Sequence, residues 1–168
     1  MVHILPHWNW EIHKSYQQVV DKYGDIPVRV YSNADSVEIF LNGKSKGRKA
    51  FQEKWTSDGR KYQEGEGSGQ LYLEWRLDYQ PGELRAVAYD RQGQIVEEDR
   101  VVTAGKAAKI GLHAEKTQLE PDGQDLLYLY FDVLDKDRNW VPSASNQLHF
   151  EIEGPARIVG VDNGRQAS

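Results

Sequence analysis

The sequence of 168 residues contains no cysteine, so it can form no disulfide framework, and its cysteine count gives no redox compartment. It also has no apolar run close to the roughly 20 residues that a membrane-spanning helix requires. Basic residues are not in excess: the formal net charge is −5, whereas phosphate binding needs a basic surface. We therefore predict neither a membrane nor nucleic acid as a partner.

The first residues, MVHILPHWNWEIHK, lack the basic leader, the apolar stretch and the small-residue cleavage site of a signal peptide. Met1 therefore need not be the natural start of the polypeptide. Apolar residues make up 39% of the chain and aromatic residues 11%, which is enough to form cores. Global disorder is not expected for such a composition.

Metal-binding motifs are also missing. His3 and His7 are four residues apart, but Pro6 between them disfavours the helix on which that spacing would pair two ligands. The run from Asp135 to Asn139 imitates the start of a calcium loop, yet its sixth position is Trp140 rather than glycine. We predict a polar hairpin tip there, no metal site and no cofactor.

No catalytic constellation can be singled out. The sequence has no GxSxG motif, and no serine stands in the context of a nucleophile elbow. A retaining glycosidase needs two carboxylates about 5 Å apart in a cleft. The carboxylates of the predicted strands and turn edges mostly face solvent, and none forms an evident pair: Glu38, Glu74, Glu83, Glu97 and Glu98. We therefore predict no catalytic residue in this chain.

The strongest structural signal is the segment Pro27–Phe51. Apolar residues recur in it with the period of two that is typical of half-buried strands: Val28, Val30, Val37, Ile39 and Leu41. The dipeptide Asn42-Gly43 follows the second run and readily takes positive φ angles. It predicts a tight hairpin turn with its tip on the surface.

Other segments of the first hundred residues give a mixed pattern. Apolar spacing and a capping pattern predict a short helix near Ser15–Tyr23, with an irregular loop as the alternative. Gln52–Gln70 is rich in glycine and polar residues and predicts a long polar loop. Strands are predicted at Leu71–Arg76, Leu84–Tyr89 and Gln94–Thr103.

Small residues at 104–108 predict a linker, and a second series of strands follows it: Lys109–Ala114, Leu126–Leu134, Leu148–Glu153 and Ala156–Val161. The spacing of the turn signals favours an all-β sandwich over βαβ units. We predict an all-β fold of two tandem immunoglobulin-like β-sandwich domains, residues 1–104 and 105–168. The second has 64 residues where such a sandwich usually has about 100, so we expect it to be incomplete.

Tryptophans are the only candidate ligand-binding side chains. Trp8 and Trp10 are two residues apart, so on a strand they would share one face, where two indoles could stack on sugar rings. They could equally pack in the core or against another domain, which is the commoner use of tryptophan. Trp55, in the predicted polar loop, is a further exposed candidate, and Trp75 is predicted to be core.

Several motifs, in order along the chain, resemble known sequences. Residues 2–10, 26–33, 37–47 and 79–89 resemble the region that follows the catalytic barrel in β-galactosidases of glycoside hydrolase family 2. Four later motifs resemble the next, bacterial immunoglobulin-like domain of such enzymes: Asp122–Asp125, Val133–Asp137, Glu153–Pro155 and Gly160–Gly164. The resemblance covers nearly the whole chain.

This resemblance implies a non-catalytic C-terminal fragment of a larger enzyme that hydrolyses terminal β-galactosides by a retaining two-glutamate mechanism. The catalytic glutamates would lie on the barrel, so the chain alone is expected to be inactive. The implied partner is the barrel of the same parent chain, with an oligosaccharide as a second candidate. The implied location is the periplasm or the exterior, and the sequence does not fix the oligomeric state.

Two alternative functions stay open. One is a stand-alone carbohydrate-binding module, in which Trp8, Trp10 and Trp55 hold a glycan. The other is an adhesion or interaction module of invasin type, which the second predicted domain suggests by itself.

Overall fold

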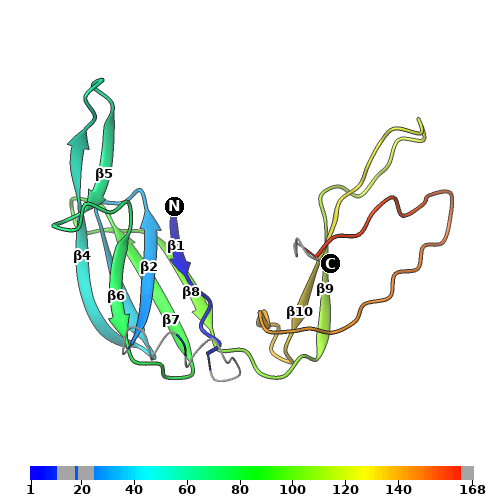
Figure 1. Ribbon diagram of the computed structural model, residues 1–168, viewed down its shortest axis with the longest axis horizontal. Coiled ribbons are helices and arrows are strands. Elements are labelled where there is room, and N and C mark those ends of the chain that lie inside the picture. Colours follow the sequence, from blue (N-terminus) through cyan, green and yellow to red (C-terminus); the bar gives the residue numbers. More distant parts are fainter. Residues whose placement is uncertain (11–17, 19–24, 164–168) are drawn as a thin grey trace.

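The computed structural model describes residues 1–10, 18 and 25–163, and within them the chain forms ten strands in three antiparallel sheets (Figure 1). The strands are β1 (Val2–Leu5), β2 (Ile26–Ser32), β3 (Ser36–Leu41), β4 (Lys44–Trp55), β5 (Lys61–Gly65), β6 (Leu73–Leu77), β7 (Glu83–Tyr89), β8 (Ile95–Val102), β9 (Lys109–Ala114) and β10 (Leu129–Leu134). The predicted all-β fold is confirmed. The predicted helix at Ser15–Tyr23 lies, apart from Gln18, outside the described residues.

The first eight strands form a sandwich of two sheets. One sheet has the order β1-β2-β6 and the other the order β5-β4-β3-β7-β8. Both sheets contribute alternate apolar residues to one buried cluster, which includes Ile4, Val28, Val30, Leu73 and Trp75 from the first sheet and Val37, Ile39, Leu41, Leu84 and Ala86 from the second. The predicted inward residues of Pro27–Phe51 are therefore confirmed as core, and so is Trp75.

The predicted turn at Asn42-Gly43 joins β3 to β4, and both residues have positive φ angles, 50° and 77°. The turn is held from outside by the loop between β6 and β7. Asn42 donates from Nδ2 to the carbonyl of Pro81 at 3.0 Å and accepts the N–H of Glu83 at 2.9 Å. The hairpin tip is thus a contact between two turns at the end of the sandwich.

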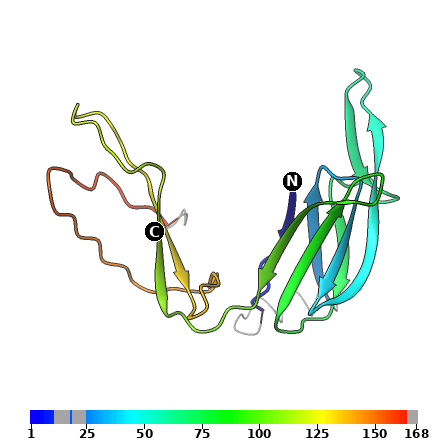
Figure 2. The same ribbon diagram turned by 180° about the vertical axis from the view of Figure 1, so that it is seen from behind.

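The prediction of a polar loop at Gln52–Gln70 is largely wrong. β4 continues to Trp55, and β5 pairs with it from Phe51↔Gly65 to Trp55↔Lys61. Charged side chains on paired strands compensate one another: Lys61 approaches Glu53 at 2.5 Å, and Lys54 approaches Glu64 at 3.6 Å. Since the two strands pair through charged side chains, residues 52–65 lack the alternation of apolar and polar residues that predicts a strand, and their composition is typical of a loop. The β4–β5 hairpin extends beyond the rest of the sandwich (Figures 1 and 2).

The later part of the chain contains a separate two-stranded sheet, β9 paired with β10. The prediction of Lys109–Ala114 is confirmed to the residue, and the strand predicted at Leu126–Leu134 is shorter, starting at Leu129. The segments Leu148–Glu153 and Ala156–Val161, predicted as strands, form no ladder in this structure. Alternation indicates which side chains prefer burial, but a strand also needs a paired neighbour. The immunoglobulin-like topology stays a prediction.

Among the described residues there is no helix with the length and apolarity needed to cross a bilayer.

Candidate functional site

The acidic residues that the sequence offers are taken up in contacts on the sandwich surface. Glu74 pairs with Arg29 at 3.0 Å, Glu98 with Arg85 at 3.1 Å, and Glu83 with Arg100 at 3.7 Å. Glu38 accepts hydrogen bonds from Ser45 and Tyr89. Within the described ranges, no group of three His, Asp or Glu side chains is arranged to hold a metal ion.

Trp8 lies in the core of the sandwich. Its side chain is 0% exposed, its ring contacts Tyr79 with 5.4 Å between centroids, and its Nε1 donates to the carbonyl of Gln80 at 2.8 Å. Residues 6–10 are not a strand, so Trp8 and Trp10 do not form the shared open face that strand geometry would give. In this structure Trp8 presents no ring face to solvent.

Trp10 is also buried, with its ring 5.0 Å from that of His7. Its Nε1 is buried and has no hydrogen-bond partner among the residues that the structure describes. A buried N–H without a partner is destabilising, so the fold would gain stability if another segment placed a hydrogen-bond acceptor next to Nε1 of Trp10.

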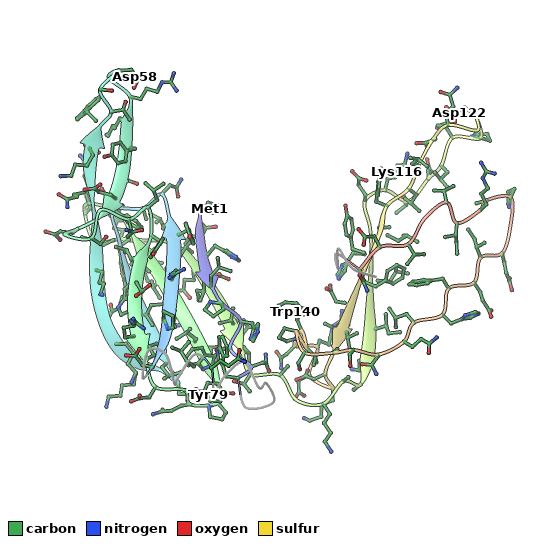
Figure 3. All side chains as sticks on the ribbon, in the orientation of Figure 1. Met1, Asp58, Tyr79, Lys116, Asp122 and Trp140 are labelled. Carbon is green, nitrogen blue, oxygen red and sulfur yellow. The ribbon has the colours of Figure 1, made fainter. Side chains whose placement is uncertain are left out.

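Trp55 is the exposed tryptophan of the three candidates. It ends β4, next to the turn of the β4–β5 hairpin, and its side chain is 67% exposed. Figure 3 labels Asp58 at the tip of that same hairpin, well away from the sandwich core. The structure therefore does not bring Trp55 together with Trp8 and Trp10.

The segment that leaves the sandwich is fixed by a pair of buried polar side chains, which we call the joint. Asn9 accepts the N–H of Ala104 on Oδ1 at 2.8 Å, and Asp135 accepts the N–H of Gly105 on Oδ2 at 2.8 Å. Two consecutive backbone N–H groups thus bind side chains from two different segments, one that follows β1 and one that follows β10. Thr103 adds a hydrogen bond from Oγ1 to the carbonyl of Trp8 at 2.6 Å.

Asp135 also organises the turn that follows β10. Its Oδ1 accepts the N–H groups of Asp137 at 2.9 Å and Asn139 at 2.8 Å, and Oδ2 accepts the side-chain amide of Asn139 at 3.1 Å. These donors, with the Gly105 N–H first among them, lower the pKa of Asp135 to about 2. The calcium-like run is therefore a polar turn, as predicted, whose first carboxylate is fully used by hydrogen-bond donors.

Besides the joint, the structure has an apolar face on the β9–β10 sheet. The register places Ile110 opposite Val133, Leu112 opposite Phe131 and Ala114 opposite Leu129, so these side chains share one face. Ile110 and Leu112 are each 60% exposed. On this face the ring of Phe150 contacts that of Phe131, with 4.8 Å between the ring centroids. The opposite face carries polar side chains, among them His113, whose Nε2 lies 3.0 Å from Oδ2 of Asp132.

Sequence reasoning missed both joint residues. Asp135 had a usable signal, because Asp-x-Asp-x-Asn is typical of a turn in which the first side chain caps backbone N–H groups. Asn9 had none, since a single asparagine between two tryptophans does not indicate which backbone group it will bind. The apolar face, in contrast, follows from the alternation in Lys109–Ala114.

Comparison with known proteins shows two family matches. Residues 24–97 match a domain of unknown function, DUF4982, and residues 110–168 match the glycoside hydrolase family 2 C-terminal domain 5.

The chain is 35% identical over 168 residues to beta-galactosidase BoGH2A of Bacteroides ovatus, which covers all of this chain and 17% of that protein. Among solved structures, a beta-glycosidase from Bacteroides vulgatus matches with a TM-score of 0.70 and 29% identity, over 92% of this chain and 17% of that one. A glycosyl hydrolase family 2 member from Bacteroides cellulosilyticus matches with a TM-score of 0.58 and 31% identity, over 81% and 15%. The chain thus spans less than a fifth of each of these proteins.

Proposed function

We propose, from the premise that this chain carries C-terminal domains of glycoside hydrolase family 2, that it is the bracing region of a larger glycosidase. In that role it contributes no catalytic group. It packs against the rest of the parent polypeptide, including the catalytic barrel, and keeps that assembly in shape.

The observation that carries this proposal is the apolar face of the β9–β10 sheet. Ile110, Leu112 and Phe131 stand on one side of a sheet of two strands, and a sheet of that size has little stability by itself. Burial of each such side chain contributes about 1.5–3 kcal/mol. An exposed face of this kind marks a contact surface, and the parent chain is the partner that the family match supplies.

The joint supports the same role. A flexible linker would let the β9–β10 sheet move freely, whereas hydrogen bonds from Ala104 and Gly105 to buried side chains fix the backbone at the exit from the sandwich. A region that braces a barrel must hold its own parts in fixed relative positions, and an ordered connection between them does so.

For the parent we propose hydrolysis of terminal β-galactosides, because the relative from Bacteroides ovatus is named a beta-galactosidase and matches this chain throughout. The retaining two-carboxylate mechanism of the family would then act on the barrel. We also propose a periplasmic or secreted location for the parent, which cell fractionation of the native organism tests.

The bracing role is tested by placing a charge on the apolar face. In the complete enzyme, Leu112→Lys should lower the melting temperature and the soluble yield, because the lysine would be buried against the partner surface. The matched control is Tyr130→Lys, on the polar face of the same sheet and 59% exposed. In the 168-residue chain alone, both variants should unfold like the wild type. Equal melting temperatures for the two variants in the complete enzyme would refute the role.

The absence of catalysis is tested separately. The 168-residue chain, incubated with chromogenic β-galactoside and β-glucoside, should release no chromophore, while the complete enzyme should cleave the galactoside. Turnover by the chain alone would overturn the non-catalytic assignment, and a complete enzyme that cleaves only the glucoside would overturn the proposed substrate.

A further inference from the structure

The turn between β3 and β4 contains an asparagine followed by a glycine. Asparagine is a thermolabile residue, and a following glycine increases its reactivity because no side chain hinders attack by the next backbone nitrogen. The chain has two such dipeptides, Asn42-Gly43 and Asn163-Gly164. Asn42 is exposed, so water and solvent bases reach it. It is therefore a candidate for deamidation, the loss of its side-chain amide nitrogen.

The reaction joins the side chain of Asn42 to the backbone of Gly43. A base from solvent removes the proton from the Gly43 nitrogen, which attacks Cγ of Asn42. A C–N bond forms, the Cγ–Nδ2 bond breaks, and Nδ2 takes up a proton and leaves as ammonia. Water then opens the resulting cyclic imide at either of its carbonyl carbons. The products are aspartate and isoaspartate, in which the backbone runs through the former side chain.

In the folded sandwich both polar atoms of this amide are engaged by the loop between β6 and β7. Nδ2 of Asn42 donates to the carbonyl of Pro81 at 3.0 Å, and Oδ1 accepts the N–H of Glu83 at 2.9 Å. The loop also approaches closely, since a Cβ at Gly82 would stand 1.9 Å from Oδ1 and 2.8 Å from Cγ of Asn42. The reacting carbon is thus held against a segment other than the one that would attack it.

The backbone of the turn is fixed as well. Asn42 and Gly43 have φ angles of 50° and 77°, and Leu41 is paired with Lys44 on either side of them. The backbone N–H of Asn42 donates to the carbonyl of Glu83 at 2.9 Å. Closure of the imide ring requires rotation of both the side chain and the backbone of Asn42. The hydrogen bonds to the neighbouring loop oppose both rotations.

We propose that Asn42 is a deamidation site that the folded sandwich keeps closed and that opens when the two turns separate. The rate then follows the population of the open state. Aspartate would place an acceptor oxygen, in place of an N–H donor, against the carbonyl of Pro81. Isoaspartate would add a backbone carbon between Leu41 and Lys44. Both products hinder the turns from meeting again, so a transient opening of this end becomes a lasting one.

The first test compares folded and denatured wild-type chain, incubated in mildly alkaline buffer and followed by peptide mapping with mass spectrometry. In guanidinium chloride Asn42 and Asn163 should deamidate at similar rates. In the folded chain Asn42 should react at least about tenfold more slowly than in the denatured chain, because its hydrogen bonds must break first. Equal Asn42 rates in the two states would refute the proposal, as would an unreactive Asn42 in guanidinium chloride.

Gly82→Ala tests whether the contact between the turns protects the amide. Its Cβ displaces the side chain of Asn42, so deamidation in the folded variant should be about tenfold faster than in the wild type. Gly93→Ala is the matched control, because Gly93 also has a positive φ, +79°, but open space around it. It should leave the rate at Asn42 close to that of the wild type. Equal acceleration by both variants would overturn the role of the contact, and the wild-type comparison stands even if Gly82→Ala does not fold.

The consequence for the turn is tested with Asn42→Asp, which has the structure of one product. Its urea midpoint should be lower than that of the wild type, because the carboxylate faces the carbonyl of Pro81. Gln92→Glu makes the same change of charge on the exposed turn between β7 and β8 and should leave the midpoint unchanged. Identical midpoints for the two variants would refute the predicted effect of deamidation on the turn.

Discussion

Asp135 accepts the backbone N–H of Gly105 at 2.8 Å, so that the residue directly after β10 fixes the segment that follows β8. Asp135→Asn would replace one acceptor oxygen by an NH₂ group facing N–H donors, and we expect a lower melting temperature. Asp137→Asn is the control, because the contact of the Asp137 carboxylate among the described residues is with the exposed Lys136.

The same carboxylate predicts how stability depends on pH. The pKa of Asp135 is about 2 in the folded chain, against an ordinary value of 3.8. A lowered pKa contributes stability that is fully present above the ordinary value and is lost as pH falls through about 2. Melting temperatures across this acid range should therefore fall more steeply for the wild type than for Asp135→Asn. Parallel profiles would contradict the assignment.

Gly82 should tolerate no side chain. Its φ is +132°, and a Cβ there would stand 1.9 Å from Oδ1 of Asn42. We expect Gly82→Ala to destabilise the sandwich by about 1–3 kcal/mol from the backbone alone, and further from the clash. Gly93→Ala, with a φ of +79° and open space around it, should cost only the backbone part.

A double variant separates the two contributions at Gly82. Asn42→Gly keeps a residue that accepts positive φ and removes the clashing oxygen. In this background Gly82→Ala should cost less in urea unfolding than it does with Asn42 present, because only the backbone part remains. An equal cost in the two backgrounds would mean that Asn42 is not the obstacle.

The loss of stability on replacing a tryptophan should depend on how deeply that tryptophan is buried. Trp8→Ala removes a fully buried indole and its hydrogen bond to Gln80, so a loss of about 3–5 kcal/mol in the free energy of unfolding is expected. Trp55→Ala, at an exposed position, should change it by less than about 0.5 kcal/mol. Denaturant unfolding measures both, and equal losses would contradict the described packing.

Arg91 ties the β4–β5 hairpin to the sandwich, because its guanidinium binds both Asp35 at 3.0 Å and Glu53. Arg91→Ala should speed hydrogen exchange of the β5 amides while changing global stability by no more than about 1 kcal/mol, since the pairs are at the surface. Arg60→Ala, which breaks a pair within the hairpin turn at 3.0 Å from Asp58, is the control. High salt should reduce the difference between Arg91→Ala and the wild type.

Local patterns were sufficient to predict the sandwich core. Alternation in Pro27–Phe51 placed Val28, Val37 and Ile39 in the interior, and Asn42-Gly43 gave the turn, because strand periodicity and positive φ depend on neighbouring residues only. The β4–β5 hairpin was missed since its pairing rests on cross-strand charges such as Glu53 with Lys61, which leave no apolar alternation.

The candidate sites depend on contacts between distant segments, which sequence spacing does not show. Trp8 and Trp10 are two apart, yet Trp8 is buried against Tyr79 and Gln80, which their spacing does not show. The joint brings Asn9 to Ala104, 95 residues away. The alternation of Lys109–Ala114 predicted a strand correctly, but whether its apolar side is covered depends on the rest of the polypeptide.

That uncovered side of β9–β10 has a consequence for biosynthesis. The sandwich buries its core with strands that end at Val102, so it can fold while the ribosome is still adding residues. The later hairpin emerges with Ile110, Leu112 and Phe131 exposed and stays so until it docks on the rest of the parent chain. During that interval it is the part of the nascent chain that chaperones would recognise, and a truncated or stalled product would show the same surface to the proteases of quality control.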